Sequence, residues 1–360
     1  HAGSTPALGI IIFYKRVIKM IKINNSLLLC IIVSLIFSFE FFQINVFNSL
    51  DTELMKKFNC TTKDLGICSS IYFYGNLIAL IPAGILLDKY STRLLILYSM
   101  FFSIIGVYIF FFSESLLLSS IGRLIIGMTG GAICFSGSLK ICSNWFHIND
   151  MSKVTGIIVS IGMLGGILSQ APFNYLIYNV GYKNASYINI FLGIIIYIIM
   201  YFFVSDYSTK YKISEKNIKN LSFFFFFKKI IKNSKNWYCG IYISLLNLPI
   251  FILGALYGNI YLVKVHLISH NDSTIITTML YIGMLIGSIL SGYISSKKKQ
   301  RIFFMFLGIL ICIINIFLLI KIKESNFFTL SLIFFLIGIS SSSQIMAYPI
   351  IIENNNINII

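Results

Sequence analysis

The sequence has few charged side chains. Charged residues make up only 11% of the 360 positions, whereas hydrophobic residues make up 57%, and the mean hydropathy is +0.87. So little polar surface cannot cover a soluble globular protein of this length. The composition therefore predicts a protein of the lipid bilayer.

The sequence also lacks the motifs of common enzyme classes. Its four histidines do not have the spacing of a zinc motif such as His-Glu-x-x-His, and it has no Gly-x-Ser-x-Gly elbow and no phosphate-binding glycine-rich loop. We predict neither enzyme activity nor a metal or other cofactor. The seven cysteines are scattered, which argues against a disulfide framework, although a bridge between Cys60 and Cys68 stays open.

Ten apolar segments are long enough to cross a bilayer, for which a helix needs about 20 residues. They predict an all-α, multi-pass membrane protein. The predicted helices cover residues 26–46, 65–87, 94–112, 117–141, 154–177, 186–204, 237–258, 274–295, 302–320 and 327–350.

The formal net charge of +16 arises from basic residues that are sorted by membrane side. If the N-terminus is cytoplasmic, 20 of the 28 lysines and arginines fall in cytoplasmic segments, seven fall outside, and Arg123 lies within a helix. This bias follows the positive-inside rule and predicts that both termini are cytoplasmic. Because membrane topology explains the positive charge, we expect no nucleic-acid partner. We expect the protein to be a monomer whose partners are a small-molecule solute and membrane lipids.

The longest polar interruption divides the predicted helices into six and four. The sequence predicts a cytoplasmic segment at 1–25, a six-helix bundle at 26–204, a cytoplasmic linker at 205–236 and a four-helix bundle at 237–360. Residues 1–19 precede Met20 and are expected to be a tag or upstream translation. The run Phe223–Phe227 in the linker fits a short interfacial helix, or a homopolymer run from an A/T-rich gene.

A decapeptide between the second and third segments recurs in the second part of the chain. Gly84-Ile-Leu-Leu-Asp88-Lys89-Tyr-Ser-Thr-Arg93 has a divergent copy 208 positions later, from Gly292 to Arg301. Gly75 and Gly283 each lie nine residues before the leading glycine of their copy. Internal repeats of this kind are typical of secondary transporters.

The decapeptide resembles a loop motif of the major facilitator superfamily, Gly-x-Leu-x-Asp-Arg-x-Gly-Arg-Arg. It matches at Gly84, Leu86, Asp88 and Arg93, while Lys89 is a conservative change and Ser91 replaces the second glycine. In the fourth segment, Arg123 followed by Gly127 matches a second family motif.

The resemblance covers about residues 26–353 and implies a fold of two pseudo-symmetric helical bundles that transport a solute by alternating access. The family has twelve helices. The resemblance therefore implies a first bundle of six helices and an incomplete second bundle of four, with the chain truncated after the tenth helix. Stretches such as Gly162–Pro172 and Ser343–Asn354 are similar to a bacterial subgroup related to phagosomal nutrient transporters and lysosomal dipeptide carriers.

Two charged residues lie inside apolar segments, where each costs at least about 2.5–3.5 kcal/mol. Glu40 and Arg123 are each about six residues from the outer end of their predicted helices, so they could pair. We hypothesise that Glu40 exchanges a proton or holds Arg123, and that Arg123 receives a carboxylate of the solute. The alternatives are a packing ion pair and a glutamate that reaches the interface.

Further polar residues in apolar segments are weaker candidates, because such residues more often bond a neighbouring helix. Those selected as solute or coupling candidates are Tyr74, Gln170, Asn247 and Gln344. Close helix packing is predicted at Gly127, Gly131, Gly162, Gly165 and Gly166. By resemblance, the loop residues Gly84, Asp88, Lys89 and Arg93 are implied to hold the halves together in the outward-facing state.

The sequence favours uptake of a small hydrophilic solute that carries a carboxylate, such as an amino acid or a short peptide. Drug exporters of the resembled family carry a Gly-Pro dipeptide in the fifth helix, and none occurs here. Coupling to protons is possible through Glu40. Efflux of drugs or metabolites and a truncated, non-transporting remnant stay as alternatives. The expected location is a bacterial inner membrane, and the alternative is an organelle membrane of an A/T-rich eukaryote.

Overall fold

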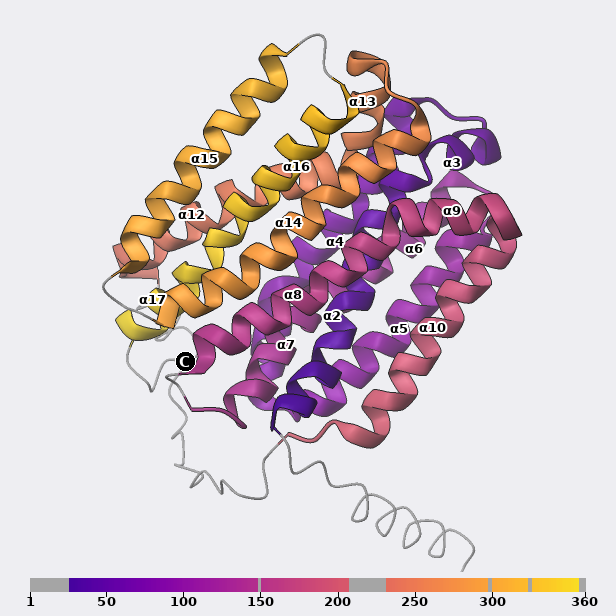
Figure 1. The fold of residues 1–360 in the computed structure, drawn as a ribbon. Coiled ribbons are helices and arrows are strands. Elements are labelled where there is room, and N and C mark those ends of the chain that lie inside the picture. Colours follow the sequence, from indigo (N-terminus) through magenta and orange to yellow (C-terminus); the bar gives the residue numbers. More distant parts are fainter. Residues whose placement is uncertain (1–25, 148–149, 207–230, 297–299, 323–325, 356–360) are drawn as a thin grey trace, which may run out of the picture.

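The computed structural model describes residues 26–147, 150–206, 231–296, 300–322 and 326–355, and every regular element in these ranges is a helix (Figure 1). The predicted N-terminal segment 1–25, most of the predicted linker with Phe223–Phe227, and Lys297–Lys299 of the second decapeptide copy lie outside the described residues. The prediction of an all-α fold is confirmed.

The described residues contain ten helices that are long and apolar enough to cross a membrane, and each overlaps one predicted segment. Several are broken by a turn of different geometry, so that one span contains two or three elements. The spans of the first half of the chain are α2 (Ser26–Ser49), α4 (Thr62–Lys89), α5 (Thr92–Phe112), α6 (Leu116–Ile126) with η1 (Gly127–Gly131) and α7 (Ala132–Ser143), α8 (Met151–Ser169) with α9 (Ala171–Val180), and α10 (Tyr182–Phe203). Those of the second half are α12 (Ser234–Pro249) with η3 (Ile250–Leu256), α14 (His270–Ser296), α15 (Arg301–Lys321), and α16 (Phe327–Ser341) with η5 (Ser342–Met346) and α17 (Ala347–Asn354).

Two short helices at the predicted outer end were not predicted. They are α3 (Asp51–Phe58) and α13 (Gly258–His266). Helix α3 has acidic residues in its first turn and lysines in its last turn, a distribution that stabilises the helix dipole, and it buries Leu54. Its apolar residues are too few to stand out from a loop in a scan for membrane spans.

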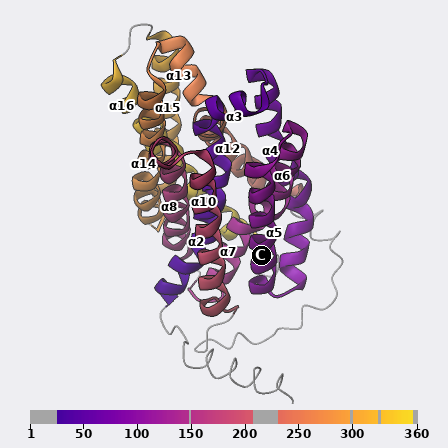
Figure 2. The same cartoon turned by 90° about the vertical axis from the view of Figure 1, so that its right-hand side faces the viewer.

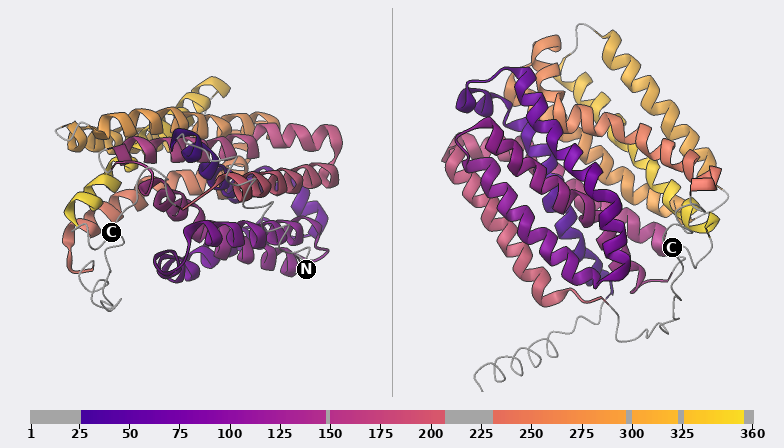
Figure 3. Two further views of the ribbon diagram at one scale, coloured as in Figure 1. Left: turned by 90° about the horizontal axis from the view of Figure 1, so that it is seen from below. Right: turned by 180° about the vertical axis from the view of Figure 1, so that it is seen from behind.

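The long helices form two groups, which we call the first half (26–206) and the second half (231–355). Figure 1 shows the orange and yellow helices of the second half beside the indigo and magenta helices of the first half, and the view from behind shows the same division (Figure 3). Figure 2 shows α2 and α8 between α14 and the group of α4, α5 and α6. The halves therefore meet mainly through α2, α8 and α14.

The repeat seen in the sequence is a repeat of helix crossings. A Cβ atom on Gly75 of α4 would lie 2.6 Å from the carbonyl oxygen of Leu124, and one on Gly127 would meet the carbonyl of Tyr72. The same reciprocal crossing joins Gly283 of α14 and Gly338 of α16, which pack on backbone atoms of Phe335 and Leu280. Glycine is required because the helix backbones touch where a side chain would stand.

The second half uses its copy of the decapeptide to contact the first half. Gly292 of α14 and Gly156 of α8 cross with each Cβ position 3.2 Å from the other Cα atom, and the Ser160 hydroxyl donates to the carbonyl of Leu285 at 3.2 Å. Gly84, the counterpart of Gly292, has nothing within 4 Å of its Cβ position. Equivalent positions of the repeat therefore have different surroundings.

We expect Gly75→Ala to lower the free energy of unfolding by about 1–3 kcal/mol, because the added methyl group meets backbone atoms that cannot move aside. Thermal unfolding of the purified protein measures the effect. Gly240→Ala is the matched control, since nothing lies within 4 Å of its Cβ position, and alanine there should leave stability unchanged or raise it by up to about 1 kcal/mol. Equal melting temperatures for the two variants would contradict the tight crossing.

Candidate solute cavity

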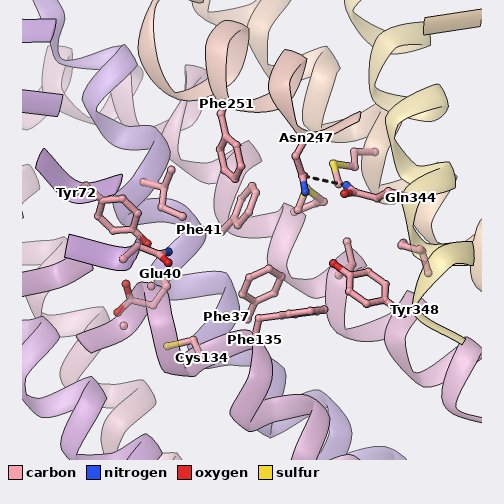
Figure 4. A pocket seen from close by; sticks show the side chains of 18 residues that line it. Phe37, Glu40, Phe41, Tyr72, Cys134, Phe135, Asn247, Phe251, Gln344 and Tyr348 are labelled. Carbon is pink, nitrogen blue, oxygen red and sulfur yellow. Dashed lines mark hydrogen bonds between the residues drawn. The ribbon is translucent and has the colours of Figure 1, made fainter. Parts of the chain in front are cut away.

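A cavity of about 170 Å³ lies between the two halves. Its walls come from α2, α4, the η1–α7 turn and α8 of the first half, and from α12, η3, α14, η5 and α17 of the second half. Its labelled lining residues in Figure 4 are Phe37, Glu40, Phe41, Tyr72, Cys134, Phe135, Asn247, Phe251, Gln344 and Tyr348.

Glu40 forms the acidic end of this cavity. Its side chain is almost fully buried, and one carboxylate oxygen accepts a hydrogen bond from the Ser103 hydroxyl of α5. The second oxygen, Oε2, has no hydrogen-bond partner, and neither has the neighbouring hydroxyl of Tyr72. A Cβ atom on Gly130 would coincide with the Glu40 carboxyl group, so glycine at that position makes room for it.

An amide pair forms the opposite end. The Gln344 side chain donates from Nε2 to Oδ1 of Asn247 at 3.0 Å, while its Oε1 has no partner. Figure 4 shows Glu40 and Tyr72 on one side of the cavity and the amide pair with Tyr348 on the other. Aromatic rings lie between them: Phe135 is 5.2 Å from Phe37 and 5.5 Å from Tyr348 between ring centroids.

Arg123 does not line the cavity, and it forms no ion pair with Glu40. Its guanidinium group is fully buried and lies 5.1–5.5 Å from the ring centroids of Phe47, Tyr72 and Phe110. One nitrogen, Nη1, donates to the backbone carbonyl of Gln43 at 2.6 Å, whereas Nε and Nη2 have no hydrogen-bond partner. Cation–π contacts of this kind stabilise a desolvated cation. The arginine therefore lies behind the Tyr72 ring.

The structure brings three of the predicted solute candidates together and separates the others. Glu40, Asn247 and Gln344 line the cavity. Tyr74 lies on α4 with 60% of its surface exposed, and it is absent from the cavity wall. Gln170 is fully buried in a contact between the halves, where all of its polar atoms are bonded.

The glycines singled out in the fourth and fifth helices each lie against another helix. Gly127 faces the carbonyl of Tyr72, and Gly131 faces the Tyr72 hydroxyl and the Asn76 amide. Gly162 packs on the Phe37 ring, Gly165 on the Ser38 carbonyl, and Gly166 on the Tyr281 ring of the second half.

Two of the cavity helices contain a π-helical turn. One is η1 (Gly127–Gly131), and the other is η3 (Ile250–Leu256), which begins directly after Pro249. Proline cannot donate its own backbone hydrogen bond, and π turns occur frequently at functional sites. Glu40 meets the first turn through Gly130, and Phe251 belongs to the second.

Hydrogen bonds join the halves at the predicted outer end. The Asn48 side chain donates to the Gly254 carbonyl at 3.0 Å and accepts from the Asn259 backbone nitrogen at 3.2 Å. Gln170 donates to the Asn45 and Gly254 carbonyls and accepts from Thr277. The Tyr281 hydroxyl donates to the Asn45 side chain. These contacts close the predicted outer end.

Charged groups add to the structure outside the spans. The Asp51 carboxylate lies 2.9 Å from Nε2 of His270, which links α3 to the start of α14 across the interface. Within the first half, the Lys57 ammonium group donates to the Phe111 carbonyl at 2.8 Å, and burial lowers the pKa of this lysine.

The decapeptide loop is bonded within the first half. Asp88 lies 2.9 Å from Nζ of Lys140, and Arg93 donates from its side chain to the Tyr201 carbonyl and from its backbone to Asp206. Lys89 is exposed. The contact between the halves that was predicted for this loop belongs to the outward-facing state. In this structure the halves are joined at the predicted outer end instead, so that contact stays a prediction.

Several residues that shape the site were not predicted. Ser103 holds the Glu40 carboxyl group, Tyr72 separates Arg123 from the cavity, and Asn48 and Asn259 join the halves. Asn48 and Asn259 lie just beyond the predicted segments 26–46 and 237–258, so a search for polar residues within those segments did not include them. No signal in the sequence distinguishes Ser103 from the other serines of the apolar segments.

The helical arrangement, the repeat and the central cavity define a membrane transport protein. A family model described as Major Facilitator Superfamily matches residues 23–355, and the chain belongs to that family. No match was found among curated proteins.

Solved structures of a bacterial homologue of the human lysosomal transporter Spinster share the fold. The inward-facing, unoccupied form has a TM-score of 0.65 at 14% identity, and the match covers 89% of this chain and 74% of that one. The inward-facing, occupied form has a TM-score of 0.60 at 13% identity, and covers 88% and 72%.

We expect Asn48→Ala to weaken the closed outer end, because it removes two side-chain hydrogen bonds between the halves, each contributing about 0.5–1.5 kcal/mol. Spin labels at Glu53→Cys and Asp272→Cys would report the separation of the halves at this end. A longer-distance population should grow in the variant. Asn179→Ala is the control, since among the described contacts Asn179 bonds only the Tyr175 carbonyl of its own helix. An unchanged distance distribution in Asn48→Ala would contradict the role of Asn48 in closing the outer end.

Proposed function

We propose that the protein is a secondary transporter that exposes the cavity between its halves alternately to the two sides of the membrane. The observation that carries this proposal is the position of Glu40, a buried carboxyl group with an unpartnered oxygen in the wall of a cavity built by both halves. The bonded contacts at one end, through Asn48 and Gln170, are those that must break for the opposite state to form.

Glu40 is the proposed site of proton coupling. Burying an ionised carboxylate away from a counter-charge is costly, whereas the neutral form is tolerated in an apolar environment. A cavity that opens to one side and then to the other lets such a group take a proton on one side and release it on the other. Ser103 bonds one oxygen and leaves the second free for the proton or for the solute.

The resemblance favours an amino acid or a short peptide as the solute, with Arg123 receiving its carboxylate. Because the guanidinium group lies behind Tyr72, this contact requires the Tyr72 ring to move. The aromatic rings of the cavity favour the second candidate function, efflux of amphiphilic compounds. We further propose that the protein is a monomer, that it lies in a bacterial inner membrane, and that both of its termini are cytoplasmic.

Counterflow of labelled amino acids and dipeptides in proteoliposomes tests transport and distinguishes a carrier from a non-transporting remnant. We expect Glu40→Gln to abolish accumulation driven by a pH gradient, since the amide cannot carry the proton, and to keep exchange only at solute concentrations that offset its weaker binding. Glu114→Gln, at an exposed position, is the control and should behave as the unmodified protein. Gradient-driven accumulation by Glu40→Gln would remove Glu40 from the coupling mechanism.

Replacing Arg123 by lysine distinguishes the carboxylate role from a structural one. Lysine keeps the positive charge but loses the planar group that contacts three rings, so we expect a lower melting temperature. If Arg123 also binds the solute carboxylate, exchange of amino acids should fall at least roughly tenfold at a temperature where the variant is folded. Unchanged exchange by a folded Arg123→Lys protein would exclude that role.

A further inference from the structure

The wall of the cavity contains one charged side chain, which is Glu40. The remaining lining residues are aromatic, aliphatic, sulfur-containing, amide or glycine residues. Three buried polar atoms in this wall have no partner: Glu40 Oε2, Gln344 Oε1 and the Tyr72 hydroxyl. The Gln344 oxygen accepts hydrogen bonds, and so does Glu40 Oε2 when the carboxyl group is ionised, so the cavity in that form favours a solute that donates hydrogen bonds at both ends.

The rings between the two acceptors favour a positively charged or apolar group. Aromatic faces attract cations and bury apolar surface. An engineered cavity of about 150 Å³ holds benzene, so a cavity of this size has room for one aromatic ring. A carboxylate would meet the Glu40 carboxyl group and no cation in the wall, since Tyr72 lies between the cavity and Arg123.

We propose that the cavity recognises an ammonium group on a solute with an aromatic body, bound between Glu40 and Gln344. The ammonium group donates to Glu40 Oε2, the aromatic body packs on Phe37, Phe41 and Phe135, and a second donor of the solute bonds Gln344 Oε1. This inference rests on the proposed transport function and names the chemistry of the solute. An amino acid or a peptide meets it through its amino terminus.

The same geometry makes the solute and the proton compete. An ammonium group binds the ionised carboxylate, and a proton on Oε2 removes both the charge and the free acceptor. The titratable groups that surround Glu40 are Tyr72 of α4, Arg123 of α6 and Cys134 of α7. The two ligands therefore exchange at one carboxyl group, which couples entry of one to release of the other.

Three probes of similar shape test the recognised group: phenethylamine, 2-phenylethanol and 3-phenylpropanoate carry an ammonium, a hydroxyl and a carboxylate group. Ligand-induced shifts in the melting temperature of the purified protein, titrated against concentration, measure apparent affinity. We expect phenethylamine to stabilise the protein and the other two to have no effect at the same concentration. Stabilisation by 3-phenylpropanoate, or by none of the three, would overturn the proposal.

Variants locate the contact. Glu40→Gln should weaken phenethylamine binding at least roughly tenfold, because it removes a charge-assisted hydrogen bond, and Glu114→Gln should leave it unchanged. Acidification should weaken binding to the unmodified protein and have no such effect on Glu40→Gln, since the amine stays charged throughout. Unchanged affinity in Glu40→Gln, or affinity that rises on acidification, would contradict the shared site.

The transport proposal is tested separately by the spin labels at Glu53→Cys and Asp272→Cys. A distance distribution that changes with pH, without binding of phenethylamine, would reject the ammonium site and keep alternating access. Binding of phenethylamine with one fixed distance under every condition would reject alternating access and keep the ammonium site.

Discussion

The cost of burying charge in hydrocarbon determines how the first half is built. Glu40 and Arg123 are both buried, and their hydrogen bonds go to different partners. Arg123 is surrounded by rings from α2, α4 and α5 and bonds a carbonyl of α2, while Glu40 accepts a bond from α5 and fits beside a glycine of the η1 turn. The positions of these helices relative to one another therefore depend on two charged groups, and Tyr72 separates the one in the cavity from the one outside it.

The two halves share the glycine crossings that the repeat encodes, but their copies of the decapeptide make different contacts. Both halves cross their paired helices at reciprocal glycines, Gly75 with Gly127 and Gly283 with Gly338. The decapeptide arginines also differ in partner: Arg93 bonds Asp206 and Tyr201, whereas Arg301 forms a bidentate pair with Glu353. Contacts between the halves are concentrated on α2, α8 and α14, and the two buried charged side chains that lie away from the ends of the apolar spans, Glu40 and Arg123, both belong to the first half.

Much of the fold was predictable because membrane helices have a simple signature of length and hydropathy. All ten spans were found, whereas α3 and α13 were missed because helices of eight and nine residues are too short to carry that signature. The sequence selected Glu40, Asn247 and Gln344, which line the cavity, but it could not show which face of a helix a polar residue occupies. Tyr74 and Gln170 illustrate this: both lie in cavity-adjacent helices, yet one is exposed and the other joins the halves. The position of Arg123 behind Tyr72 depends on tertiary packing between four helices.

The fourth helix contains a π turn at Gly127–Gly131, directly before the residues that it contributes to the cavity wall. A π turn accommodates one residue more than an α turn, and one residue corresponds to about 100° around an α-helix. If this segment changes between the two geometries, the part of the helix beyond it turns about its own axis with little change in length. Cys134 and Phe135, which follow the turn, would then leave the cavity wall together. A local change in backbone hydrogen bonding can thus be converted into a different cavity surface.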